Sequence, residues 1–174
     1  AAQIAALIGA DPDEIVFTSG ATESNNVALL GAAKRAVGGE RSRILLGATE
    51  HKCVLEVGRI IERDLGYRVS HIPVDAAGRI NHDRLDAELG DDVLLVSVMA
   101  VNNEIGTIQD IPTIARMTSQ YGCILHCDAA QAACATDSSG FARHADMMNF
   151  AVHKVYGQMR IGALFVERYR QPAI

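Results

Sequence analysis

The sequence predicts an α/β layered fold with a mostly parallel sheet, and three observations support this prediction. Short apolar runs rich in β-branched residues alternate with segments of helical period along the whole chain. Several of these runs lack polar alternation, which is typical of strands buried on both faces of a sheet. The chain has 174 residues, of which 49% are hydrophobic, so it is long enough to form one domain with a substantial core.

The apolar runs define the expected strands in chain order. Each has the length of an ordinary strand and stops at glycine, proline or a polar cluster. The predicted strands are Ile15–Thr18, Arg43–Leu46, Arg68–Val74, Val93–Val101, Ile124–Asp128, Met147–Val152 and Ile161–Val166.

The segments between these runs carry apolar residues at helical spacing, with capping residues before them and glycines after them. The predicted helices are the start of the chain up to Gly9, Val27–Val37 before Gly38, Val54–Leu65 before Gly66, the segment from Asn81 to Gly90 and the segment from Asp110 to Gly122.

Composition and charge exclude several classes of protein. Sixteen Lys and Arg against 21 Asp and Glu give a net charge of −5 with no basic run, which argues against nucleic-acid binding. No apolar stretch approaches the length of a membrane span, so no membrane association is predicted. Four cysteines do not describe a disulfide scaffold and favour a reducing, cytoplasmic setting. The chain begins without Met and ends soon after a predicted strand, so we expect a fragment of a longer protein.

Chemically useful side chains collect where the predicted strands end. In open parallel sheets, ligands bind just beyond the carboxyl ends of the strands. Five such ends carry the turn Ser19–Ser24 before a helix, His51, the pair Asn102-Asn103, Asp128 with Gln131, and His153-Lys154.

Each of these groups also has a plain structural interpretation, which is weakest for Asp128. Ser19–Ser24 fits an ordinary helix start and His51 a helix cap, although free N–H groups at a helix start also favour an anion. Asp128, in contrast, ends an apolar strand and needs a hydrogen-bonding or cationic partner there. Lys154 taken alone fits an ordinary solvated lysine, but its place after a hydrophobic strand adds weight to a pocket that lowers its pKa.

Two other kinds of site fit the sequence poorly. Cys123, Cys127 and Cys134 lie close to His126, but adjacent strand residues point to opposite faces and no paired C-x-x-C is present, so no metal site is predicted. These cysteines fit small core residues better. A serine hydrolase is also disfavoured, because the chain has no Gly-x-Ser-x-Gly turn.

One cofactor would use every group at the predicted strand ends. Pyridoxal phosphate needs an anion cradle, a lysine for its Schiff base and a carboxylate at its pyridinium nitrogen. The carboxylate keeps this nitrogen protonated, so that the ring accepts electrons from the substrate Cα. An imidazole can lie over the ring, and Asn and Gln side chains can bind its phenolic oxygen.

The same segments resemble cysteine desulfurases, in the class-V aminotransferase group. The matching motifs follow the family's order over essentially the whole chain. They are Phe17–Asn26, Thr49–Lys52, Val101–Gly106, His126–Gln131, His153–Gly157 and Ile161–Val166.

The resemblance implies a three-layer α/β/α domain over residues 1–174 with seven strands, the last of them antiparallel. It also implies a homodimer that takes L-cysteine to L-alanine and passes sulfur, through an enzyme persulfide, to an acceptor protein used in iron–sulfur cluster assembly. Lys154 and His51 would be the catalytic residues. The residues implied to bind the cofactor are Ala21, Thr22 and His153 at the phosphate, Asn103 and Gln131 at the phenolic oxygen, Asp128 at the ring nitrogen, and Lys154 and His51 at the ring.

Three departures from the family pattern leave alternatives open. The family's sulfur-accepting cysteine lies downstream of the matched region and no cysteine here replaces it, Cys53 included, since two residues apart on a helix is not a shared face. We therefore expect this chain alone not to complete desulfuration. Ala151 replaces a hydroxyl residue, Val152 replaces a glycine, and residues 157–160 form an altered loop.

The alternatives to a desulfurase are of three kinds. A second class-V activity, such as selenocysteine lysis or transamination, would use the same cofactor site. A non-catalytic truncated domain would account for the departures at Ala151 and the altered loop. A nucleotide-binding domain would use Ser19–Ser24 as its phosphate loop, but it lacks the expected Gly-Lys spacing and leaves Lys154 unexplained.

Overall fold

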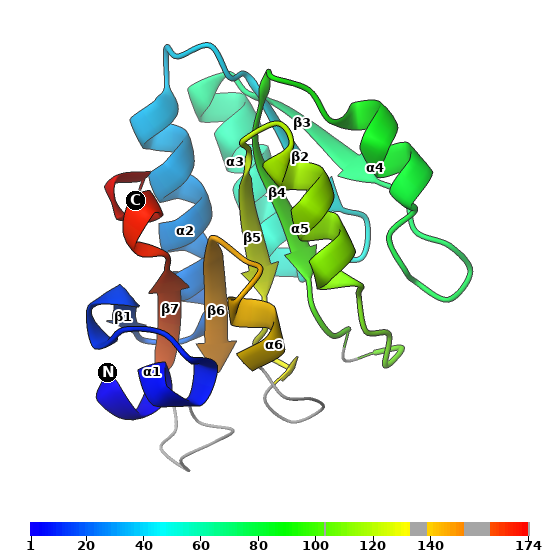
Figure 1. Cartoon of the computed structure of the whole chain (residues 1–174). Coiled ribbons are helices and arrows are strands. Elements are labelled where there is room, and N and C mark those ends of the chain that lie inside the picture. Colours follow the sequence, from blue (N-terminus) through cyan, green and yellow to red (C-terminus); the bar gives the residue numbers. More distant parts are fainter. Residues whose placement is uncertain (103, 133–138, 152–160, 174) are drawn as a thin grey trace.

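The computed structural model describes residues 1–102, 104–132, 139–151 and 161–173 (Figure 1). Its strands are β1 (Ile15–Thr18), β2 (Arg43–Gly47), β3 (Arg68–Ile72), β4 (Val93–Met99), β5 (Ile124–Asp128), β6 (Met147–Ala151) and β7 (Gly162–Val166). Its helices are α1 (Ala2–Ile8), α2 (Ala21–Ala36), α3 (Lys52–Leu65), α4 (His82–Glu88), α5 (Ile111–Ser119) and α6 (Ser139–Ala142), with short 3₁₀ segments η1 (Pro12–Glu14) and η3 (Arg168–Ala173).

Within the described residues the strands form one seven-stranded sheet in the order β1-β7-β6-β5-β4-β2-β3. Neighbouring strands from β6 across to β3 run parallel, whereas β7 runs antiparallel to both β1 and β6. The predicted fold class, the seven strands and the reversed last strand are therefore confirmed. Because β7 alone of these strands is reversed, the carboxyl ends of β1, β2, β4, β5 and β6 meet at one edge.

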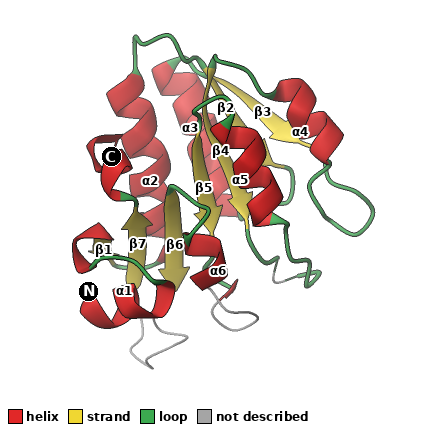
Figure 2. Cartoon of the chain, in the orientation of Figure 1, coloured by secondary structure: helices red, strands yellow, loops and turns green. Residues whose placement is uncertain are grey.

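Helices cover both faces of the sheet and complete three layers (Figure 2). Helices α2 and α3 lie on one face, over an apolar cluster that includes Leu46 and Leu95. Helices α1, α4, α5 and α6 lie on the other face, over a cluster that includes Val96 and Leu125. Successive residues of β4 and β5 thus alternate between two apolar layers, which explains why these strands lack polar alternation.

The predicted elements are right in kind, and the described strand ends differ from the prediction by two residues at most. Helix α2 is the exception, because it begins at Ala21, six residues before the predicted Val27, where the apolar stripe starts. Strand β3 stops at Ile72 because Pro73 has no N–H for the ladder, and Val74 forms only an isolated bridge with Ile80. Strand β4 stops at Met99, and Val101 likewise forms an isolated bridge. The predicted caps are confirmed: the side chain of Asn81 accepts the Arg84 N–H, and the side chain of Asp110 accepts the Thr113 N–H.

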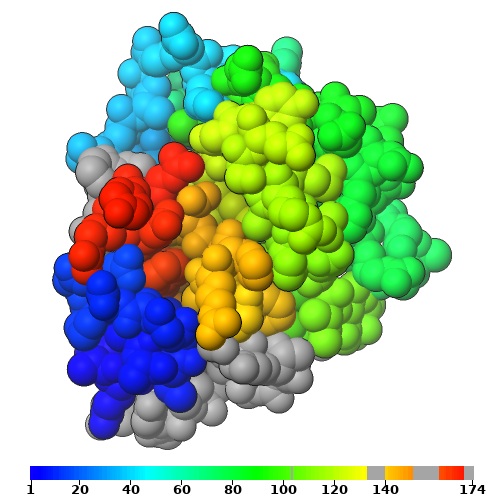
Figure 3. Space-filling view, viewed as in Figure 1, coloured from blue at the N-terminus to red at the C-terminus, as the bar shows by residue number. Residues whose placement is uncertain are grey.

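The first and last described segments lie side by side on the face shown in Figure 3. Arg168 ties them together: its guanidinium donates to the carboxylates of Asp11, at 2.6 Å, and Asp13, at 3.1 Å, while its backbone N–H donates to Glu14. These pairs are exposed, so they orient η1 and η3 more than they stabilise the fold. No described helix is long and apolar enough to cross a membrane.

Candidate functional site

The predicted meeting of strand ends is confirmed for the residues that the structure describes. Strand β1 leads through Ser19 and Gly20 into α2, and β2 leads through Thr49 and Glu50 to His51 at the start of α3. Strand β5 ends at Asp128 on the same edge, beside the end of β4. Asn103, His153 and Lys154 lie outside the described residues.

Asp128 is a buried acid held by hydrogen-bond donors. Its Oδ2 accepts from Asn25 Nδ2 at 2.9 Å. Its Oδ1 accepts from Asn149 Nδ2 at 3.0 Å and from the Ala130 N–H at 3.1 Å. The residue is 4% exposed, and no salt bridge to it is found among the described residues. The sequence predicted a partner for this acid, and the partners are neutral amides.

A chain of contacts joins Asp128 to His51. Asn25 Nδ2 also lies 3.3 Å from Cys53 Sγ, and Cys53 Sγ lies 3.0 Å from His51 Nδ1. The Cys53 backbone N–H donates to the same Nδ1 at 3.2 Å, so Nδ1 is the ring's acceptor and Nε2 carries the proton of the neutral imidazole. His51, at the start of α3, and Asp128, at the end of β5, are therefore linked through Asn25 and Cys53.

The expectation that Cys53 and His51 share no face is wrong. It treated both as helical residues, but His51 is the N-cap of α3, with φ −58° and ψ 146°, so its ring folds back over the first turn. Burial raises the pKa of the half-buried Cys53 thiol, and the negative charge of Asp128 raises it further, while hydrogen bonds from Asn25 and Thr22 oppose the shift. Cys53 is a protonated neighbour of the site and not an activated nucleophile.

The start of α2 offers backbone donors to an anion. Gly20 is its N-cap and supplies no side-chain hydrogen bond, and the helix has 16 residues. The predicted residues Ala21 and Thr22 lie in its first turn. The fold brings β7 so close here that a Cβ on Gly162 would lie 2.5 Å from the Gly20 carbonyl carbon. Glu23 turns back to accept the Ser19 N–H, which holds the pKa of its carboxyl below the usual value.

A second polar cluster lies deeper under α2 and α3. Ser97 Oγ is 2.8 Å from His126 Nδ1 and 3.5 Å from Glu50 Oε2, and Glu50 also accepts the Met99 N–H. All three side chains are buried. Burial, together with the negative charge of Asp128, raises the pKa of Glu50 to about 8. Burial lowers the pKa of His126 to about 4, so both groups are neutral near pH 7.

An open cleft of about 500 Å³ lies beside His51 between the ends of β2 and β4. The Asn102 side chain lines this cleft and connects its two sides. Its Nδ2 donates to the Thr49 carbonyl at 3.3 Å, and its Oδ1 accepts the N–H groups of Glu104 and Ile105. Asn102 is therefore a loop-ordering residue. The described lining of this cleft is Thr49, Glu50, His51, Lys52, Leu55, Met99, Asn102, Glu104 and Ile105.

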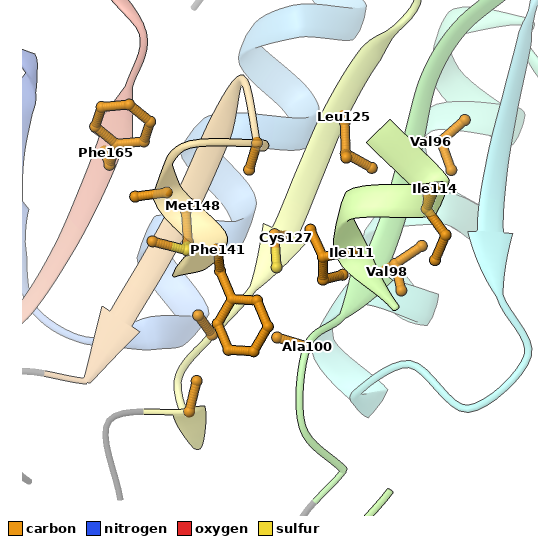
Figure 4. Close-up of a cluster of buried hydrophobic side chains, with 14 of the residues drawn as sticks. Val96, Val98, Ala100, Ile111, Ile114, Leu125, Cys127, Phe141, Met148 and Phe165 are labelled. Atoms are coloured by element: carbon orange, nitrogen blue, oxygen red, sulfur yellow. The ribbon is translucent and has the colours of Figure 1, made fainter. Parts of the chain in front are cut away.

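Among the described residues, no group of three His, Cys, Asp or Glu side chains that could hold a metal ion occurs. Cys127 points into the apolar cluster that includes Ile111 and Met148 (Figure 4). His126 precedes it in β5 and therefore faces the other side of the sheet, where it contacts Ser97. Cys123 is also buried, and burial raises its pKa to about 11. Cys134 lies outside the described residues. Gln131 follows β5 closely and is half-buried.

Sequence reasoning gave no role to four residues around Asp128. Asn25 and Asn149 donate hydrogen bonds to it, and its charge raises the pKa values of Glu50 and Cys53, the second of which had been considered and set aside. One signal was available for two of them. Asn25 stands on the buried side of α2, in helical register with the apolar Ala28, Leu29 and Ala32. Asn149 interrupts the apolar strand β6 directly opposite Asp128 in the parallel ladder. A polar residue at such an apolar position predicts a polar partner.

Comparisons with known proteins agree with this geometry. The family model described as aminotransferase class-V matches residues 1–173. The chain is 45% identical over 166 residues to the cysteine desulfurase IscS of Photorhabdus laumondii, and 46% identical to that of Klebsiella pneumoniae. Each match covers 95% of this chain and 41% of the relative, so the chain spans about two-fifths of the length of these curated relatives.

Solved structures with the same fold include relatives of moderate identity. One is SspA in complex with cysteine, with a TM-score of 0.89 and 36% identity over 98% of this chain and 49% of that one. Another is DndA from Streptomyces lividans, with a TM-score of 0.85 and 38% identity over 94% of this chain and 45% of that one.

Proposed function

We propose that this chain, which belongs to the class-V aminotransferase family, is the cofactor-binding domain of a cysteine desulfurase and that the domain comprises residues 1–174. Class-V aminotransferases depend on pyridoxal phosphate. The observation that carries the proposal is Asp128, a buried acid at a strand end whose described partners are all neutral donors.

The residues present fit the ring nitrogen of this cofactor. Three N–H donors hold the two carboxyl oxygens of Asp128 in place. Among the described residues, Asp128 Oδ2 accepts one hydrogen bond, from Asn25, and a carboxylate oxygen can accept a second. Asp128 can therefore accept a hydrogen bond from a protonated pyridine nitrogen and keep that nitrogen charged.

The residues also fit the phosphate. The N-terminal N–H groups of α2 at Ala21 and Thr22 favour an anion, because they point out of the helix and the helix dipole adds positive potential. Asn25, which contacts Asp128, follows Ala21 by four residues, about 6 Å along the helix axis. That separation suits a pyridine ring with a short phosphate arm.

The proposed roles of the chain's own residues follow from this placement. Bound here, pyridoxal phosphate would supply an electron-accepting ring that stabilises negative charge on the Cα of an amino acid. Asp128 would hold the proton on the ring nitrogen. His51, at the mouth of the cleft, would lie over the ring and exchange protons through Nε2. We propose that Lys154 is the amine that binds the cofactor and moves the Cα proton. We further propose that His153 binds the phosphate and that Asn103 and Gln131 bind the phenolic oxygen.

We propose L-cysteine as the substrate, because the relatives are named cysteine desulfurases and SspA is described in complex with cysteine. Its sulfur would pass to a cysteine and then to a separate acceptor protein. We further propose a homodimer. Its interface would cover apolar side chains that are about half exposed near the carboxyl ends of the strands. These are Phe17 at 52%, Ile105 at 57% and Ile108 at 47%. A cytoplasmic location suits the free thiols of Cys53, Cys123 and Cys127.

Reductive trapping tests the proposed cofactor site. Purified protein is mixed with pyridoxal phosphate, its visible absorbance is recorded, and borohydride is added before peptide mass spectrometry. The chain has three lysines, Lys34, Lys52 and Lys154, so the modified peptide identifies the amine. We expect modification at Lys154, abolished in Lys154→Ala and retained in Lys34→Ala. Trapping at Lys52 or at no lysine would contradict the proposal.

A further inference from the structure

The side-chain amide of Asn25 contacts both Asp128 and Cys53, the neighbour of His51. Asn25 is 1% exposed, and its Nδ2 lies 2.9 Å from Asp128 Oδ2 and 3.3 Å from Cys53 Sγ. A side-chain amide nitrogen has two hydrogens, so these two contacts use its full donor capacity. An amide oxygen could not replace it, because the carboxylate accepts only. The orientation of the Asn25 side chain is therefore determined by Asp128.

A second amide holds the other oxygen of the same acid. Asn149 Nδ2 lies 3.0 Å from Asp128 Oδ1, and Asn149 is buried in the strand next to Asp128. Asn25 approaches from α2, above the sheet, and Asn149 from within the sheet. The two amides approach from different directions, so together they restrict rotation of the carboxylate about its Cβ–Cγ bond.

The contact from Asn25 to Cys53 extends this restraint to His51. Cys53 Sγ and the Cys53 backbone N–H both lie against His51 Nδ1, at 3.0 and 3.2 Å. Rotation of Asn25 would therefore release the thiol and remove one of the two groups that orient the imidazole. Asp128 and His51 are thus linked through described residues alone.

We propose that Asn25 is a positioning residue that aims Asp128 Oδ2 and, through Cys53, fixes the ring of His51. This inference rests on the proposed function, because it assigns Asn25 a part in holding the two groups that would face the cofactor. Asn25 itself contacts Asp128 and Cys53 and acts through them.

The thiol of Cys53 provides a test that needs no cofactor. The pH dependence of iodoacetamide labelling at Cys53, followed by peptide mass spectrometry, gives a midpoint that steric access does not change. Loss of a donor to the thiolate should lower the thiolate fraction at a given pH by about tenfold or more in Asn25→Ala. The neighbouring Asn26→Ala is the matched control and should leave the midpoint unchanged. Asn25→Asp keeps the shape, removes both hydrogens and should move the midpoint the same way if Asn25→Ala fails to fold.

The carboxylate provides the second measurement. The ¹³C resonance of the Asp128 carboxyl carbon at pH 7 should move in Asn25→Ala and stay in place in Asn26→Ala. The titratable neighbours of Asp128 among the described residues, Glu50, Cys53, His126 and Cys127, are the same in both variants. An unmoved thiol midpoint or an unmoved carboxyl resonance in Asn25→Ala would overturn the inference.

The same variants separate this inference from the proposed function. If the parent chain traps no cofactor but both signals move, the proposed function fails and the link through Asn25 stands. If the parent traps cofactor at Lys154 and neither signal moves, the link fails and the proposed function stands. In the loaded protein, Asn25→Ala should raise the Kd for pyridoxal phosphate by about tenfold or more.

Discussion

Replacing Glu50 by Gln should change how the stability of the protein depends on pH. Glu50 is buried between the ends of β2 and β4, and its pKa is raised from 4.5 to about 8, first by burial and then by the charge of Asp128. The folded state therefore favours the protonated acid. The stability that this provides is fully present below about pH 4.5 and is lost as the pH rises through about 8. Gln keeps the shape and cannot ionise.

The size of the effect follows from Glu50 and His126 together. The pKa of His126 is lowered from 6.5 to about 4, so its contribution is present above pH 6.5 and lost as the pH falls through about 4. Between about pH 4.5 and 6.5, Glu50 lowers the free energy of unfolding as the pH rises while His126 raises it, so the two effects oppose each other. From pH 6.5 to about 8, only the Glu50 effect of this pair remains. At about 1.4 kcal/mol per pH unit, the parent should lose about 2 kcal/mol across that upper window.

Urea unfolding at half-unit steps between pH 6.5 and 8 measures this loss, with the free energy of unfolding extrapolated to water. The parent should lose about 2 kcal/mol, whereas Glu50→Gln should lose almost nothing and be the more stable of the two at pH 8. Glu104→Gln changes an exposed acid at the same edge and should keep the parent's slope. A slope that survives in Glu50→Gln, or a parent that shows none, would refute the reasoning.

Two further substitutions test the packing and capping that place the site. Gly162→Ala should destabilise the protein by about 1–3 kcal/mol, because the new Cβ would lie 2.5 Å from the Gly20 carbonyl carbon. Thermal unfolding measures this, and Gly140→Ala, with nothing within 4 Å of its Cβ, is the control; equal stabilities would contradict the proposed close approach. Asn81→Ala should cost about 1 kcal/mol, because the Asn81 side chain caps α4 at the Arg84 N–H. Asn81→Asp retains an acceptor and should recover most of that loss in the same assay, and failure to recover it would argue against capping.

Local patterns in the sequence were sufficient to predict the architecture. Runs such as Ile124–Asp128 and Ile15–Thr18 match the observed strands at both ends. Strand β5 is buried along its whole length, as its apolar run predicts, whereas β1 lies at the sheet edge and leaves Phe17 half exposed. Element ends were predicted less well where tertiary pairing decides them. Val101 is as apolar as the residues before it, yet it lies beyond β4, since its ladder partner is Ile108 of the following loop.

The site was predictable in outline, and its internal contacts were not. That Asp128 and His51 approach one edge follows from parallel strands alone. That Asn25 joins them depends on where α2 crosses the sheet, which residue spacing does not determine, since Asn25 and Asp128 are 103 positions apart. Cys53 was misjudged because the backbone at His51 is extended and not helical. A capping residue folds its side chain over the first turn, so helical spacing rules do not apply to it.

The sheet face under α2 and α3 passes from hydrocarbon to polar groups along β5. Along β5 this face passes from Ile124, packed in hydrocarbon, to the neutral His126 and then to Asp128. In the neighbouring strand it passes from Leu95 through Ser97 to Met99. The polar groups deeper in this row are neutral near pH 7, so they add dipoles without a competing charge. A charge at Asp128 is then stabilised by amides from Asn25 and Asn149 at the point where the core ends. Burial and then the like charge of Asp128 raise the pKa of Glu50, so Glu50 stays neutral near pH 7 and adds no second charge beside Asp128. The proton on Glu50 therefore connects the pH dependence of stability to the chemistry proposed for this edge.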